Sequence, residues 1–184
     1  MYLRALKVIN KVQFRGKLWD KINKFTLYKR VHMNGFIGEY NCKLDSKYRL
    51  SVPSGLSKQL DPNDQDQFVV NRGLNGCINL YPVSEWAKVM AGLRKLNRFK
   101  AKNLEFIRKF QNGATKVAID GSGRVLLPKH LIEYAGISKE VVLSSAIDQI
   151  EIWDKATYNS MMQSNNEDFA ELAEEVMGNL DNDE

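Results

Sequence analysis

The chain has 184 residues, 43% of them hydrophobic, and its 27 lysines and arginines against 22 acidic residues give a formal net charge of +5. This length and composition allow a buried core, and no apolar run approaches the roughly 20 residues that span a bilayer. Cys42, Cys77 and the two histidines lack the spacing of a metal site, so we expect reduced cysteines in a cytosolic protein, with no metal and no cofactor.

Charge is distributed unevenly along the chain. Residues 1–32 carry nine basic residues and one acid, and residues 86–116 carry nine basic residues against Glu105. Residues 148–184 reverse this balance, with eleven acids against Lys155. The position of charge, more than the total, therefore bears on any nucleic-acid partner.

Three interpretations of the basic extension at residues 1–32 stay open. It could be an arm for nucleic acid or a membrane surface, a targeting peptide, or an upstream extension outside the working protein. Met33 stands directly before the first well-patterned strand and could serve as a start, which favours the third interpretation.

Strict alternation of apolar and polar residues over 36–44 predicts the first strand. A polar turn from Asp45 to Arg49 leads to a second short strand, after which Pro53 opens a short helix. Strands at 68–71 and 77–81 follow, joined by the hairpin turn Asn75-Gly76.

Apolar residues at helical spacing predict two helices next, the first with Ser84 as its cap and the second ending at Asn112-Gly113. A second copy of the strand pattern begins at Thr115, with Pro128 opening its helix. Two further helices are predicted from Asp154 and from Asn166.

The two copies share more than their pattern. Asp45, Arg49 and Pro53 return at a constant spacing as Asp120, Arg124 and Pro128. A duplicated structural unit explains this recurrence, and each β unit alone is too small to bury both faces, so we expect the halves to interlock into one barrel. The predicted organisation is a basic extension (1–32), a first repeat (35–82), a helical connection (83–112), a second repeat (113–156) and an acidic helical tail (157–184).

Each copy thus presents an Asp-x-x-x-Arg turn, for which two explanations compete. The aspartate and arginine can pair with each other and with backbone groups, which would only hold the turn. An arginine on a stiff turn beside hydroxyls and backbone N–H groups also suits phosphate contacts or bidentate recognition of guanine. Recurrence of the turn in both halves favours the second explanation.

The run Asp-Ser-Lys-Tyr-Arg-Leu-Ser-Val-Pro at 45–53, followed by Asp-Gly-Ser-Gly-Arg-Val-Leu-Leu-Pro at 120–128, resembles the MraZ family, two-repeat relatives of the AbrB/SpoVT swapped-hairpin DNA-binding domains. The resemblance covers roughly residues 33–178. It implies an α+β fold, mainly β with flanking helices, built as a double-psi or swapped-hairpin β-barrel from the two repeats.

The resemblance also implies a function. It indicates a cytoplasmic, nucleoid-associated, ring-shaped homo-oligomer that binds double-stranded DNA at promoter direct repeats. There it would repress the division and cell-wall gene cluster, including its own promoter. The family's DNA-contacting motif carries over to eight residues: Asp45, Ser46, Lys47, Arg49, Asp120, Ser122, Gly123 and Arg124.

One position departs from the family pattern, because Tyr48 stands where the family has glycine and where the second copy keeps Gly123. If this position needs a positive φ, the tyrosine is strained by about 1 kcal/mol or more.

Two other function classes remain. Residues 86–116 could make the protein a general RNA- or DNA-binding module, although such a charge run can equally be a solvated helix face. An enzyme of the double-psi barrel class is the third, but no paired acids or activated nucleophile can be placed in the sequence, so we expect no catalysis.

Overall fold

The computed structural model of the chain describes residues 35–163 and 166–178. The extension predicted at residues 1–32 lies outside this part. Among the described residues, no helix has the length and apolar character needed to cross a membrane.

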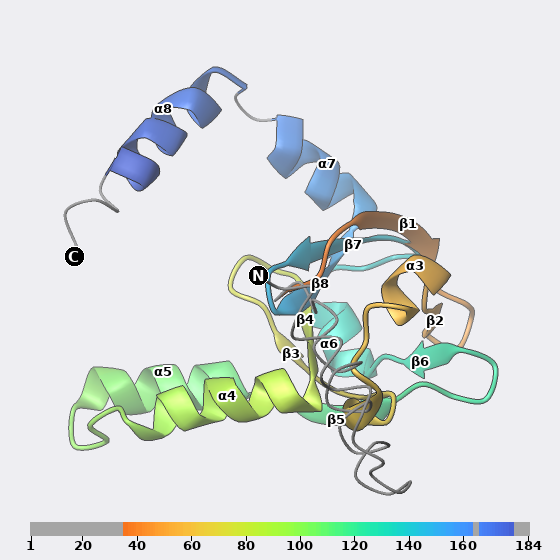
Figure 1. Ribbon diagram of the computed structural model, residues 1–184, viewed down its shortest axis with the longest axis horizontal. Coiled ribbons are helices and arrows are strands. Elements are labelled where there is room, and N and C mark those ends of the chain that lie inside the picture. Colours follow the sequence, from red (N-terminus) through yellow and green to blue (C-terminus); the bar gives the residue numbers. More distant parts are fainter. Residues whose placement is uncertain (1–34, 164–165, 179–184) are drawn as a thin grey trace, which may run out of the picture. The chain divides into compact units, whose positions relative to one another are not determined.

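Most strands belong to one antiparallel sheet with the order β1-β7-β8-β4-β3-β5 (Figure 1). A separate two-stranded ribbon joins β2 to β6. The strands are β1 (Glu39–Lys43), β2 (Arg49–Ser51), β3 (Gln67–Arg72), β4 (Ile78–Pro82), β5 (Thr115–Ala118), β6 (Arg124–Leu126), β7 (Glu140–Ala146) and β8 (Gln149–Asp154).

The two copies exchange strands. β1 of the first copy pairs with β7 of the second, β5 of the second pairs with β3 of the first, and β2 pairs with β6. Within each copy, the pairs β3–β4 and β7–β8 are hairpins. The predicted interlocking of the halves is confirmed.

The ribbon connects the two edges of the large sheet. Single antiparallel bridges join Leu44 to Leu50, between β1 and β2, and Ile119 to Val125, between β5 and β6. With the β2–β6 pairing, these bridges complete a circuit of strands, so neither β1 nor β5 is left as a bare sheet edge. The predicted class, mainly β with flanking helices and a barrel made from both repeats, is confirmed.

The interior is filled by side chains of both copies. Seventeen buried residues form one cluster, in which Phe68, Val70, Val125 and Val141 have at most 1% of their surface exposed. Burial at this level in both copies explains why the halves cannot be separated without exposing apolar surface.

Both cysteines are free thiols in the described structure, Cys42 half-buried and Cys77 buried. Burial raises the pKa of both, that of Cys77 to about 12, so these thiols are protonated and unreactive at neutral pH.

The helices are α3 (Ser54–Ser57), the 3₁₀ turn η1 (Pro62–Asp64), α4 (Val83–Arg94), α5 (Ala101–Gln111), α6 (Lys129–Tyr134), α7 (Lys155–Gln163) and α8 (Asn166–Gly178).

The prediction that Ser84 caps the first long helix is wrong. Helix α4 begins at Val83, so Ser84 already lies in its first turn. The carboxylate of Asp64 serves this end instead, accepting hydrogen bonds from the Ser84 backbone N–H at 2.8 Å and from its hydroxyl at 2.9 Å. A distant residue thus satisfies an N–H group that the helix leaves without an internal partner.

Helices α4 and α5 form a hairpin anchored to the barrel at one end. The Trp86 ring stacks on Phe110 with centroids 5.7 Å apart and tilts against Tyr81 of β4 at 5.6 Å. Because Trp86 lies near the start of α4 and Phe110 lies near the end of α5, the two helices run antiparallel, as Figure 1 shows. A matching contact joins Trp153 to Tyr158 in the second copy, at 6.3 Å.

Candidate nucleic-acid interface

The first Asp-x-x-x-Arg turn is organised around Asp45. One carboxylate oxygen accepts the backbone N–H groups of Lys47 and Arg49 at 2.8 and 3.0 Å. The other oxygen accepts the Arg49 side-chain Nε–H at 2.6 Å. The aspartate therefore holds both the turn and the direction of the arginine.

The second turn repeats this arrangement. Asp120 accepts the backbone N–H groups of Ser122 and Arg124 at 2.8 and 3.0 Å, and the Arg124 Nε–H at 3.2 Å. A second guanidinium nitrogen of Arg124 lies 3.1 Å from the same carboxylate. Two segments far apart in sequence thus build nearly the same loop.

The last loop position needs a left-handed backbone in both copies. Gly123 has φ 73° and Tyr48 has φ 60°. In this conformation, the Tyr48 carbonyl accepts a hydrogen bond from Leu127 and the Gly123 carbonyl accepts one from Val52. Each loop is therefore tied to the other copy's strand, and the tyrosine occupies a backbone region that side chains disfavour.

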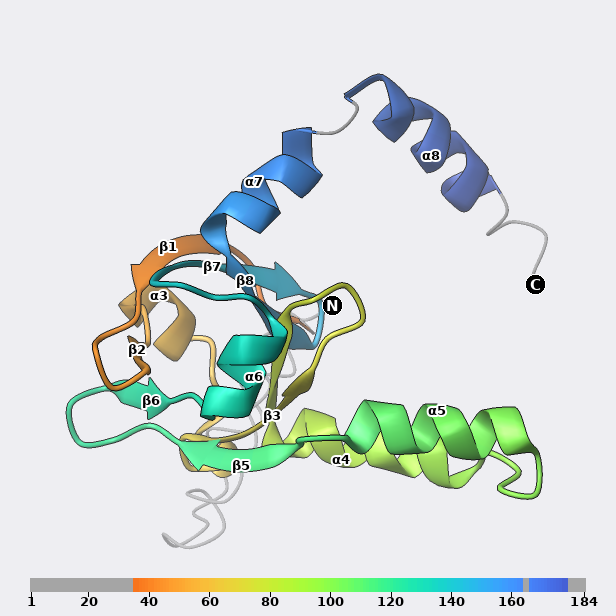
Figure 2. The ribbon, with the colours of Figure 1, turned by 180° about the vertical axis from the view of Figure 1, so that it is seen from behind.

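The β2–β6 ribbon brings the two arginines onto one face. Leu50 and Val125 are opposite each other and fully buried, whereas the alternate positions point outward. Arg49 lies opposite Leu126 and Arg124 lies opposite Ser51, so the two arginine Cα atoms are diagonal neighbours, about 7–8 Å apart. Figures 1 and 2 show both loops emerging on the same side of the barrel.

Both carboxylates stay ionised under physiological conditions. The backbone N–H of Arg49 is the main reason that the pKa of Asp45 falls to about 2. Partial desolvation raises the pKa of Asp120, but hydrogen bonds from the backbone of Arg124 and Ser122 bring it below the ordinary value. Each guanidinium carries five N–H donors, and those not bound to aspartate remain for a ligand.

Comparison with known proteins shows the same duplication. The family model described as "MraZ protein, putative antitoxin-like" matches residues 36–109 and again residues 110–180. The chain belongs to the MraZ family. Each match takes in one Asp-x-x-x-Arg loop and the strands that exchange with the other copy.

Several curated relatives are similar over most of their length, and each is named "Transcriptional regulator MraZ". That of Christiangramia forsetii is 53% identical over 152 residues, which are 82% of this chain and 98% of the relative. That of Flavobacterium psychrophilum is 48% identical over 153 residues, 83% of this chain and 98% of the relative. The more distant protein of Pediococcus pentosaceus is 39% identical over 142 residues, 77% of this chain and 96% of the relative.

The residues implied by the MraZ resemblance lie in the two Asp-x-x-x-Arg loops. In both loops the tip residues Ser46, Lys47 and Ser122 are exposed. Arg49 and Arg124 are half-buried where the loops enter the ribbon. Two further outward residues of the ribbon, Ser51 and Leu126, were not predicted as site residues. Alternation around the buried Leu50 and Val125 was the sequence signal that could have found them.

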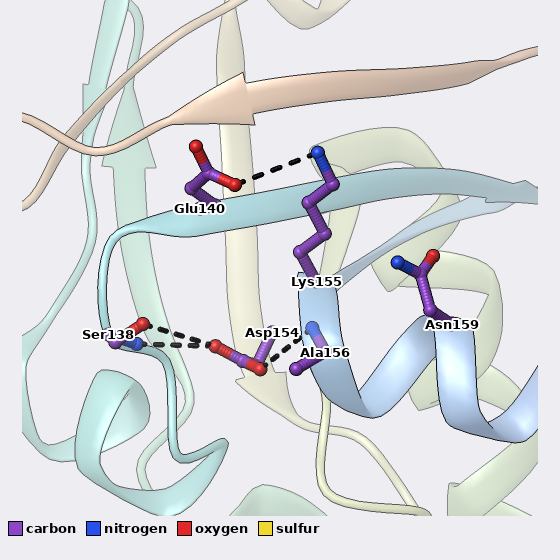
Figure 3. Close-up of a pocket in the computed structure, with 6 residues that line it drawn as sticks. All are labelled: Ser138, Glu140, Asp154, Lys155, Ala156 and Asn159. Atoms are coloured by element: carbon purple, nitrogen blue, oxygen red, sulfur yellow. Dashed lines mark hydrogen bonds and ion pairs between the residues drawn. The ribbon is translucent and has the colours of Figure 1, made fainter.

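A second surface feature is a polar pocket of about 360 Å³ at the start of α7 (Figure 3). Glu140 lies between Lys43, at 2.9 Å, and Lys155, at 3.6 Å. Asp154 accepts the backbone N–H of Ala156 at 3.0 Å and contacts Ser138. These charges already have partners in the fold, so we interpret the pocket as structural.

Among the described residues, no group of three or more histidines, cysteines or acids could hold a metal ion.

Proposed function

We propose that this protein is a transcriptional regulator that binds double-stranded DNA sequence-specifically and represses the division and cell-wall gene cluster, including its own promoter. The observation that carries the proposal is the pair of matched loops, each holding an arginine with an aspartate on the exposed face of one ribbon. The shared name of its relatives supports the regulatory role.

The ribbon has a suitable shape and chemistry for DNA. The major groove admits a two-stranded ribbon, and arginine forms bidentate hydrogen bonds with guanine there. Arg49 and Arg124 keep guanidinium donors beyond the Nε–H bound to aspartate. Lys47 and Ser122 at the loop tips, together with Ser46, would contact phosphates and fix the register of the protein on the duplex.

We propose a ring-shaped homo-oligomer that binds promoter direct repeats. One ribbon offers two arginines, so repetition of the ribbon around a ring raises the overall affinity through multivalency. Such a protein would work in the cytoplasm on the nucleoid, without catalysis and without a membrane partner.

The alternative is a general nucleic-acid module that uses the α4–α5 hairpin. Lys88 and Lys109 have acidic partners, Glu85 and Glu105, within the hairpin. Other basic residues there have no ion pair within the described part of the chain, and these could contact nucleic-acid backbones. Binding to the DNA upstream of the gene, to unrelated duplex and to RNA of equal length distinguishes the two functions, because the alternative predicts equal affinities.

The proposal is tested by Arg49→Ala and Arg124→Ala. Each variant should weaken binding to the upstream DNA by about 1–3 kcal/mol per contacted site and weaken binding to unrelated duplex much less. Fluorescence anisotropy with both DNAs, together with thermal unfolding of each variant, measures this difference. Lys139→Ala, at an exposed position outside the loops, is the matched control and should leave the ratio of the two affinities unchanged. An unchanged ratio in both arginine variants would exclude base recognition by these residues.

A further inference from the structure

The outward face of the β2–β6 ribbon carries one apolar side chain among polar ones. The two strands are fully described, and of their four outward residues Leu126 alone is apolar. It is 57% exposed, although its neighbours in the chain, Val125 and Leu127, are buried. A firmly packed backbone therefore holds this leucine outward. Single exposed leucines are common in proteins, so the position of Leu126 has to carry the argument.

The strand pairing fixes Leu126 beside Arg49. The backbone N–H of Leu127 donates to the carbonyl of Tyr48 at 3.0 Å. Hydrogen-bonded and non-hydrogen-bonded pairs alternate along an antiparallel ladder, so the next pair, Arg49 with Leu126, is of the second kind. Residues of such a pair have Cα atoms about 4.5 Å apart and side chains in close proximity. Leu126 and the Arg49 guanidinium thus belong to the same small area of the ribbon.

The surroundings of Leu126 indicate which kind of partner it can contact. Together with Tyr48 and Val117 it lines an open depression of about 500 Å³. Lys116 and Lys129 line the same depression and are exposed. An apolar surface bordered by cations suits a polyanion that carries apolar groups. Double-stranded DNA is such a partner, because the thymine 5-methyl groups lie in its major groove.

The second arginine of the ribbon has a different neighbour. Arg124 lies opposite Ser51, which is the counterpart of Leu126 in the first copy and is also exposed. A serine hydroxyl can donate or accept a hydrogen bond and so tolerates several bases. Leucine offers only apolar contact. The two arginines therefore have similar loops but chemically different surroundings.

We propose that Leu126 contacts the 5-methyl group of a thymine beside the guanine that Arg49 binds. The inference rests on the proposed function and adds one base to the sequence that the ribbon recognises. Because Ser51 occupies the corresponding place beside Arg124, only one side of the ribbon requires a methyl group. The recognised DNA sequence then has a direction, which agrees with direct repeats, whereas a ribbon with identical sides would bind in either orientation.

Replacement of thymine by deoxyuridine tests the contact, because it removes only the 5-methyl group. The probe is the shortest duplex from the DNA upstream of the gene that the protein still prefers, with each thymine replaced in turn. At one position the unchanged protein should bind about fourfold more weakly, as expected for one buried methyl group. Leu126→Ala should bind the thymine and deoxyuridine duplexes at that position with equal affinity. Fluorescence anisotropy measures both, and the coupling between the two changes isolates the contact.

Two further variants serve as controls. Leu126→Met keeps an apolar side chain of similar volume, so the preference for thymine should persist. Leu74→Ala removes another exposed leucine, 83% exposed in the turn between β3 and β4. It should leave the affinity and the preference for thymine unchanged. Thermal unfolding and the mass by light scattering should be the same for all these variants, because neither leucine lies in the core.

Several outcomes would overturn the contact. One is a duplex in which no thymine methyl group affects binding, and another is a Leu126→Ala variant that keeps the full preference for thymine. A reduced mass of Leu126→Ala, with that preference intact, would assign the leucine to a contact between copies instead. In each of these cases, retained preference for the upstream DNA would leave the proposed function standing. An unchanged protein with no preference for the upstream DNA would overturn both proposals.

Discussion

Tyr48 and Gly123 occupy the same place in the two loops with different consequences. Both have a positive φ, and both direct a carbonyl toward the other copy. Glycine adopts this backbone without strain, whereas tyrosine does not. The Tyr48 side chain packs against the core cluster, and this contact offsets part of the strain. The first loop therefore keeps the geometry of the second despite the missing glycine.

Gly123→Ala isolates the cost of the left-handed backbone. A Cβ at this position would meet no atom within 4 Å, so the substitution should lower the free energy of unfolding by about 1 kcal/mol through backbone strain alone. Denaturant unfolding measures the change. Gly121→Ala is the matched control, because its Cβ is equally unobstructed and its φ is not in the left-handed range. Equal effects of the two substitutions would contradict the explanation.

The ionisation of Asp45 gives a prediction about acid. Its pKa is about 2 in the fold, against an ordinary 3.8. Because the folded pKa is the lower one, the carboxylate's contribution to stability is complete above about pH 4 and is lost as the pH falls toward 2. Carboxyl NMR titration should give a midpoint near pH 2 for Asp45 and below 3.8 for Asp120.

Arg49→Ala serves as the control for this titration. The largest cause of the low pKa of Asp45 is the backbone N–H of Arg49, which the alanine variant retains. The midpoint should therefore rise only part of the way toward its ordinary value. A complete return would mean that the guanidinium, not the backbone of the turn, holds the carboxylate ionised.

At the scale of elements, α4 depends on a residue that lies outside it. Asp64 belongs to the 3₁₀ turn η1 and accepts both the backbone N–H and the hydroxyl of Ser84. The start of the hairpin is thereby fixed to the loop that precedes β3. This connection ties the first turn of the α4–α5 hairpin to the chain segment before β3.

Asp64→Ala should destabilise the first turn of α4 on the order of 1 kcal/mol, as the loss of an N-terminal cap does. Hydrogen exchange at the amides of that turn is the measurement, and protection of the β-sheet amides should change little. Ser84→Ala is the control with the smaller expected effect, since its backbone N–H can still donate to Asp64. If the hydroxyl variant proved the more damaging, the backbone hydrogen bond would not be the main contact.

At the scale of the whole molecule, exchange of strands makes each copy dependent on the other. The strands β1, β2 and β3 of the first copy pair with β7, β6 and β5 of the second. Within the first copy, β3 and β4 pair with each other as a hairpin. A hairpin by itself is only marginally stable in water. The duplication is thus a requirement of the fold.

A fragment of residues 35–112 should accordingly fold only by pairing with a second chain. We expect its circular dichroism and thermal unfolding to depend on concentration, and addition of a fragment of residues 113–178 should restore a folded complex. The uncut chain is the control. Its two copies are joined in one chain, so its barrel should fold without any added fragment. A folded single-chain fragment at low concentration would contradict this dependence.

Local patterns in the sequence determined the strands, the turns and the recurrence of Asp45, Arg49 and Pro53 as Asp120, Arg124 and Pro128. They did so because alternation, proline and turn residues act over a few neighbouring positions. The motif also identified the loops, and the positive φ required at Tyr48 and Gly123 agrees with the glycine expected there.

The tertiary structure alone decided how these parts meet. Alternation does not specify which strand is the partner, so the pairing of β2 with β6, and with it the single face shared by Arg49 and Arg124, depended on contacts between distant segments. The cap of α4 was missed for the same reason. Asp64 is 20 positions from Ser84, beyond the local signals that indicate a helix start, and only folding brings the two together.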